Sequence, residues 1–215
     1  MIPAPPAAIV LPDVSAVAPR PAARMGLRAV GLGGALAALV ALPPLGAVLE
    51  AGMATHMLLQ YPALLLAGAL GACGLPRRWR AGLDAWNELG ISGLLFVTLA
   101  LAVLMIPRVL DLALTDGRVE FLKIASLLGC GLALVTSWRR AGLVVQGFFL
   151  GNVLPMTAVA GSLYIDAPLR ICNAYRLDEQ QQVGAALVAI VTTVAIAWLA
   201  STGWRLVRHE QCSES

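Results

Sequence analysis

The stretch Gly52-Met-Ala-Thr-His-Met-Leu-Leu-Gln-Tyr-Pro62 opens an apolar segment that continues to Leu75 without one Asp, Glu, Lys or Arg. A segment of about 20 apolar residues is long enough to cross a bilayer as a helix. We therefore expect residues 52–75 to form a transmembrane helix. His56, the histidine of this chain that sits in an apolar run, then lies about one turn inside one end of that helix.

Composition extends this prediction to the whole chain. Hydrophobic residues make up 59% of the 215 residues and charged residues only 13%, whereas soluble domains are about 25% charged. The chain is therefore expected to be all-α, a polytopic membrane helix bundle with room for roughly six spans. The expected spans are residues 29–48, 52–75, 89–106, 119–138, 143–165 and 183–204.

The distribution of basic residues predicts how this bundle is oriented, because cytoplasmic loops carry an excess of Lys and Arg. With six spans, ten basic residues fall on the side of both termini and five on the other side. We therefore expect a multi-pass protein of the bacterial inner membrane with both termini in the cytoplasm. Residues 1–24 would be a flexible Pro/Ala-rich cytoplasmic tail, residues 25–208 the membrane domain, and residues 209–215 a polar tail.

Charge and cysteine content exclude several classes of protein. The net charge is +3, and the arginines lie in short clusters between apolar runs. Membrane lipid headgroups, rather than nucleic acid, are the expected neighbours of such clusters. The four cysteines form no CxxC pair, so that they predict neither a disulfide framework nor a zinc site.

A small group of side chains around His56 could carry chemistry. Met53 lies three residues before His56 and Gln60 four residues after it, so that all three share one face of a helix; Met57 is its neighbour. Thioether and imidazole groups together suit copper(I), which makes His56, Met53 and Met57 candidate metal ligands. The alternative is a helix that packs methionine as core filler and hydrogen-bonds one buried histidine.

Other unusual groups are expected near the same outer end, where they could serve structure or partner binding. Ionisable and polar residues at membrane depth are costly, which makes them functional candidates. For Glu120 and Lys123 the plain alternative is an interfacial pair, three residues apart, that reaches toward water. The candidates are Gln60, Asp111, Glu120, Lys123, Asn152, Met156, Gln181 and Gln182.

Three further chemistries find little support. Membrane haem usually needs a facing pair of axial ligands, but His56 and His209 are expected on opposite sides. No GxSxG, HExxH or SxxK motif indicates an enzyme, and we expect none. Asn152 and Pro155 hint at the broken helix of a transporter.

The Gly147-Phe-Phe-Leu-Gly151 motif predicts a helix-packing face.

Three stretches together resemble a known family. They are His56-Met-Leu-Leu-Gln-Tyr-Pro-Ala-Leu-Leu-Leu66; Pro107-Arg-Val-Leu-Asp111-Leu-Ala-Leu114 before a span ending at Trp138; and Tyr175 followed by Asp178-Glu-Gln-Gln-Gln-Val-Gly184-Ala. In order and spacing they resemble the caa-type cytochrome c oxidase assembly factors (CtaG-like), multi-span proteins of bacterial membranes. The likeness covers roughly residues 50–200. The chain would be a divergent member, since that family is richer in histidine where this chain has Gln60, Arg118, Glu120 and Lys123.

The resemblance implies a function. It implies an assembly or maturation factor for a respiratory haem-copper cytochrome c oxidase, one that contacts an oxidase subunit and handles copper(I) at the outer membrane face. Two other functions stay open: a structural accessory subunit of a membrane complex, held by GxxxG-type helix contacts, and a small-solute transporter.

Overall fold

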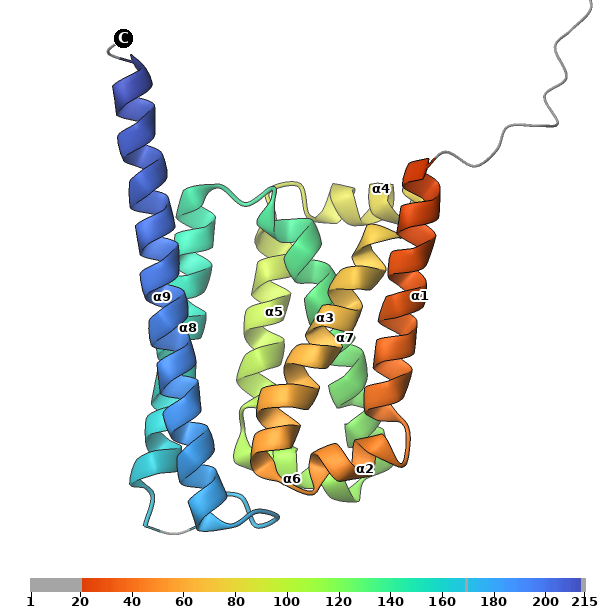
Figure 1. Cartoon of the computed structure of the whole chain (residues 1–215), viewed down its shortest axis with the longest axis vertical. Coiled ribbons are helices and arrows are strands. Elements are labelled where there is room, and N and C mark those ends of the chain that lie inside the picture. The colour runs from red at the N-terminus through yellow and green to blue at the C-terminus, as the bar shows by residue number, and fades with distance from the viewer. Residues whose placement is uncertain (1–20, 169, 214–215) are drawn as a thin grey trace, which may run out of the picture.

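The computed structural model describes residues 21–168 and 170–213, and every regular element in those ranges is a helix (Figure 1). This confirms the all-α prediction. The helices are α1 (Pro21–Ala41), α2 (Leu45–Glu50), the π-helical turn η2 (Thr55–Gln60), α3 (Tyr61–Cys73), α4 (Arg77–Trp86), α5 (Ile91–Leu104), α6 (Pro107–Thr115), α7 (Gly117–Trp138), α8 (Leu143–Asp166) and α9 (Leu177–Ser213).

The long helices stand side by side, and the short ones lie across the two ends of the bundle (Figure 1). Helix α3 packs between α1 and α7, α7 also packs on α5, and α8 connects α5 to α9. Helices α2 and α6, turn η2 and residues 170–176 lie together at one end, which we call the network end. Helix α4 and the last turns of α3 and α7 form the opposite end, which we call the arginine end.

Four helices are long and apolar enough to cross a membrane: η2 with α3, α7, α8 and α9. The pair α4 and α5 adds a fifth if it counts as one span, although the two helices are bent by 84° from each other. Helix α5 alone has 14 residues, about 21 Å, which is shorter than the hydrocarbon core of about 30 Å. The described chain is thus a multi-pass bundle of four to five candidate spans, with α1 a shorter apolar helix.

Some helix boundaries differ from those expected from the sequence. Helix α1 begins at Pro21, so residues 21–24 belong to it rather than to the N-terminal tail, and residues 1–20 lie outside the described residues. Helix α9 continues to Ser213, beyond the expected end of the membrane domain. Helix α8 matches the expected fifth span closely and continues through Pro155.

Glycines allow the closest helix contacts, although not the expected ones. A side chain on Gly68 or Gly131 would overlap the backbone of the facing helix where α3 crosses α7, and Gly161 and Gly184 face each other where α8 crosses α9. Gly151 of the expected GxxxG face has open space around it. Gly147 of the same motif lies against the ring of Trp198 of α9, so the predicted packing face is formed at Gly147 and not at Gly151.

The π-helical turn η2 sits just before Pro62. The N–H of Tyr61 donates to the carbonyl oxygen of His56, five residues back, which is the bonding pattern of a π-helix. Proline has no N–H to donate, and its ring crowds the carbonyl of the residue four positions earlier. The wider turn relieves that conflict, and it places His56 and Gln60 on the same inner face.

Candidate functional site

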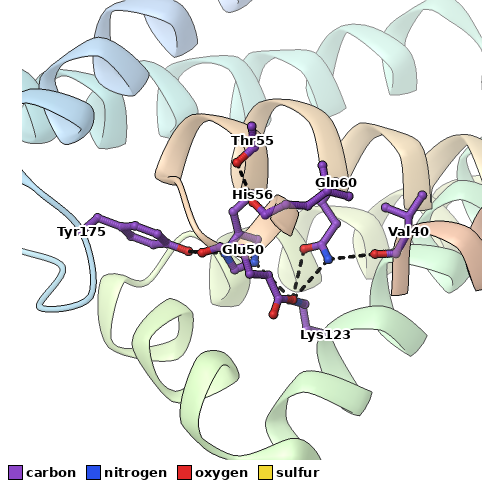
Figure 2. A network of polar contacts seen from close by, with 8 residues as sticks. Val40, Glu50, Thr55, His56, Gln60, Lys123 and Tyr175 are labelled. Atoms are coloured by element: carbon purple, nitrogen blue, oxygen red, sulfur yellow. Dashed lines mark hydrogen bonds and ion pairs between the residues drawn. The ribbon is translucent and has the colours of Figure 1, made fainter. Parts of the chain in front are cut away.

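Lys123 is the centre of a buried polar network at the network end (Figure 2). Lys123 lies in the first half of α7 and is 1% exposed. Its Nζ atom lies 2.7 Å from Glu50 Oε1, 3.1 Å from His56 Nε2 and 3.3 Å from Gln60 Oε1. An ammonium group has three hydrogens and accepts none, so these three acceptors satisfy it completely. The sequence-based expectation that Lys123 reaches toward water or pairs with Glu120 is therefore wrong.

Glu50 and Gln60 complete the acceptor side of this network. Gln60 donates from Nε2 to Glu50 Oε1 and to the carbonyl oxygen of Val40, both at 3.2 Å. Thr55 holds the preceding turn by donating to the carbonyl oxygen of Leu49 at 2.6 Å. The network therefore joins the end of α1, helix α2, turn η2 and helix α7, which are far apart in the sequence.

The contacts of His56 assign its tautomer. Because the Lys123 ammonium can only donate, His56 Nε2 accepts, and the ring proton then sits on Nδ1. That proton is donated to the hydroxyl oxygen of Tyr175, 2.6 Å away. The Tyr175 hydroxyl in turn donates to the backbone oxygen of Glu50 at 3.0 Å. A neutral imidazole thus satisfies both ring nitrogens, and His56 is fully buried.

Two side chains hold the segment 170–176, which carries Tyr175, against the bundle. Asp111 of α6 accepts from the backbone N–H groups of Asn173 at 2.9 Å and Ala174 at 3.3 Å. Gln180 of α9 accepts from the N–H of Ile171 at 3.0 Å and donates to the carbonyl oxygen of Tyr164 at 3.3 Å. Asp111 and Gln180 therefore hold the backbone that leads to Tyr175, whose side chain bonds His56.

The electrostatics of this end follow from burial and from the Lys123 charge. Burial opposes ionisation of Glu50, but the hydrogen bond and charge of Lys123 outweigh it and lower the pKa of the carboxyl. Burial, followed by the nearby Glu50 charge, raises the pKa of Tyr175, so its hydroxyl stays protonated. Burial also raises the pKa of Cys172 to about 11, so that thiol is a poor nucleophile at neutral pH.

These contacts do not fit a copper(I) ion on His56. Both ring nitrogens are already hydrogen-bonded, and an ammonium occupies the position that a cation would take at Nε2. Met53 and Met57 are buried in the apolar core beside Leu64 and Tyr164. Among the residues that the structure describes, no cluster of three or more His, Cys, Asp or Glu side chains could hold a metal. Copper binding by His56, Met53 and Met57 stays a prediction.

Of the other candidates, only Glu120 lies beside this network. Asn152 is exposed on α8 and donates to the carbonyl oxygen of Phe148, and Met156 is half-buried one turn further on. Gln181 and Gln182 are exposed, so the structural role expected of them falls to the buried Gln180. Glu120 is half-buried and close enough to Glu50 and Lys123 to interact with them.

Two residues that matter here, Glu50 and Gln180, carried a weak signal in the sequence. For Glu50 the signal was its position, because it is the one acidic residue beside the span that holds His56. Gln180 precedes the buried Val183 by three residues and the contact residue Gly184 by four. That helical spacing, rather than the position of the glutamines relative to Asp178, indicates which glutamine faces inward.

Comparison of this chain with protein families, with curated proteins and with solved structures found no match.

Proposed function

We propose that this protein is an integral-membrane assembly or maturation factor for a respiratory haem-copper cytochrome c oxidase, acting in a bacterial inner membrane. One observation carries the proposal. The three stretches on which the resemblance rests meet at one end, because His56 of the first bonds Tyr175 of the third, and Asp111 of the second holds Asn173 and Ala174 just before it. His56, Asp111 and Tyr175 are 55 and 64 residues apart along the chain, and convergence of such distant residues is what a shared functional region requires.

In this proposal the chain crosses the membrane six times, with α1 and α5 as the two spans beyond the long helices. The start of α1 and the end of α9 lie at the same end of the bundle (Figure 1), as an even number of spans demands. That end also carries Arg78, Arg80, Arg139 and Arg140. The excess of positive charge favours a cytoplasmic location for it, which leaves the network end at the outer face.

The proposed mechanism is presentation of a fixed protein surface to an oxidase subunit, without catalysis. An open cavity of about 650 Å³ at the network end is lined by Arg108, Asp111 and Thr115 of α6 and by Asn173 of the facing segment. Asp111 bonds Asn173 and Ala174, which line the same cavity, and the buried network at this end fixes α2, η2 and α7. A rigid surface binds more tightly because less conformational entropy is lost on association.

The test is deletion of the gene followed by complementation, with assembled oxidase measured from its haem absorption in isolated membranes. Arg108 is exposed and lines the cavity, so Arg108→Glu should lower assembled oxidase several-fold while the protein still accumulates. Arg118→Glu reverses an exposed charge outside that cavity and should complement fully. Normal oxidase in the deletion strain would overturn the proposal.

Co-purification separates this function from the other two. An assembly factor is captured with oxidase subunits only during synthesis, whereas a structural accessory subunit stays in the mature complex at fixed stoichiometry. A transporter would instead show solute uptake that fails when Asn152 is changed.

Copper(I) titration under reducing conditions tests metal handling: one bound ion that is lost in His56→Ala would contradict a purely structural role for the network.

A further inference from the structure

The arginine end carries an amphipathic helix that lies across the bundle. Helix α4 is bent by 84° from α5 and crosses the ends of the long helices (Figure 1). Trp79, Leu83 and Trp86 form one exposed apolar stripe along it, at spacings of four and three residues. Helices with tryptophan on one face and arginine on the other lie in the interface between lipid tails and headgroups.

A basic cavity of about 380 Å³ opens where α4 meets the last turns of α3 and α7. Its charged lining consists of Arg80, Asp84, Arg139 and Arg140. Arg140 is paired with Asp84 at 2.6 Å, and Arg80 donates to the carbonyl oxygen of Ala72 at 3.1 Å. Within the described part of the chain, Arg139 takes part in no ion pair.

The charge balance of the cavity favours one anion. Three arginines and one aspartate leave a formal charge of +2. The C-terminal ends of α3 and α7 each contribute about half a negative charge, so about one positive charge remains for a ligand to neutralise. The Arg139 guanidinium has several N–H donors of the kind that bind phosphate.

An apolar cavity lies next to the basic one. It measures about 280 Å³ and is lined by Leu83, Trp86, Phe96 and Leu132. Thr136 lines both cavities, so that a polar site and an apolar site adjoin at the membrane interface. A free anion would use only the first, whereas a lipid uses both.

We propose that this end of the bundle binds an anionic phospholipid. Its phosphodiester group occupies the basic cavity beside Arg139 and Arg80, and one acyl chain lies in the apolar cavity beyond Thr136. The site is remote from the network end, and it does not depend on the function proposed above.

The experiment counts lipids retained by the purified full chain, by native mass spectrometry after transfer from nanodiscs of phosphatidylglycerol or of phosphatidylcholine. Phosphatidylglycerol should be retained preferentially. One arginine near an anionic lipid strengthens binding about fivefold, so Arg139→Gln should lower that preference about fivefold and Arg139→Lys should preserve most of it. Arg118→Gln, at the other end of the same helix, should change nothing.

Three outcomes would overturn the proposal. One is equal retention of the two lipids by the unmodified chain. Another is an unchanged preference in Arg139→Gln. The third is displacement of the lipid by inorganic phosphate or by glycerol 3-phosphate, since these carry the anion without an acyl chain and would mark a site for a free anion.

Discussion

At each end of the described bundle a short ion pair ties α7, or the turn that follows it, to a neighbouring helix, but the two pairs differ in their access to water. At the network end Lys123 Nζ and Glu50 Oε1 are 2.7 Å apart, and the side chains are 0% and 15% exposed. At the arginine end Arg140 and Asp84 are 2.6 Å apart, and their side chains are 33% and 35% exposed. The distances are nearly equal, so the difference between the pairs lies in their surroundings.

The comparison shows what burial demands of a charged group. Water can replace either partner of the Arg140–Asp84 pair, so the side chains around it need not be arranged in any special way. The Lys123 ammonium group is buried away from water, and each of its three hydrogens bonds an acceptor of the protein. Removing one partner of such a buried arrangement leaves a charge uncompensated, and the penalty is large. The network therefore acts as a unit that fixes four chain segments.

The largest expected effect comes from Lys123→Met. This change removes the cation and leaves Glu50, His56 and Gln60 without their shared donor, and it should lower the free energy of unfolding by about 3–5 kcal/mol. Urea or thermal unfolding in detergent micelles measures it. Adding Glu50→Gln to this variant should restore a large part of the loss. If the single variant is as stable as the unmodified protein, the two ends do not differ as described.

A smaller effect is expected from Tyr175→Phe. The phenyl ring keeps the packing, but His56 Nδ1 loses its acceptor, and the change should lower stability by about 1–2 kcal/mol. Amide hydrogen exchange should rise in residues 170–176, since Tyr175 is one of their ties to the bundle. Asn152→Ala is the control, because that exposed side chain bonds only within its own helix.

The pair at the network end should also respond to acid. The pKa of Glu50 is lowered in the folded protein from its ordinary value of 4.5, so its contribution to stability is present above about pH 4.5 and is lost as the pH falls through the lowered value. Unfolding midpoints measured from about pH 7 to about pH 3 should fall more steeply in the unmodified protein than in Glu50→Gln. Parallel curves would contradict this role of Glu50.

The smallest effect belongs to the arginine end. Asp84→Asn removes the charge that Arg140 meets at the surface, and exposed pairs of this kind contribute less than about 1 kcal/mol. The same unfolding measurement should therefore register little change. A loss as large as that of Lys123→Met would erase the contrast between the two ends.

The all-helical, multi-pass character was predictable because the length of an apolar run is a local property of the chain. Residues 143–166 show this well, since a mostly apolar run that has no charged residue before Asp166 forms one helix. The expected span 89–106 brackets α5 (Ile91–Leu104), but no pattern in the sequence indicated that α4 before it would turn away by 84°.

The site was only partly predictable. The sequence indicated His56 and Gln60 on one face, and both face inward. It placed Lys123 with Glu120 because three residues separate them, whereas the structure pairs Lys123 with Glu50, 73 residues away. Contacts of that kind depend on how α2 folds back beneath α3, and no periodicity in the chain encodes them.

The wide turn before Pro62 has a consequence for any change in chain length there. Deleting one residue between His56 and Gln60 would let the backbone return to ordinary α winding, and each residue of such winding spans about 100° of rotation. The imidazole would then swing away from the cation while every side chain of the network remained in the protein. At this point the number of residues, as much as their identity, determines which groups meet.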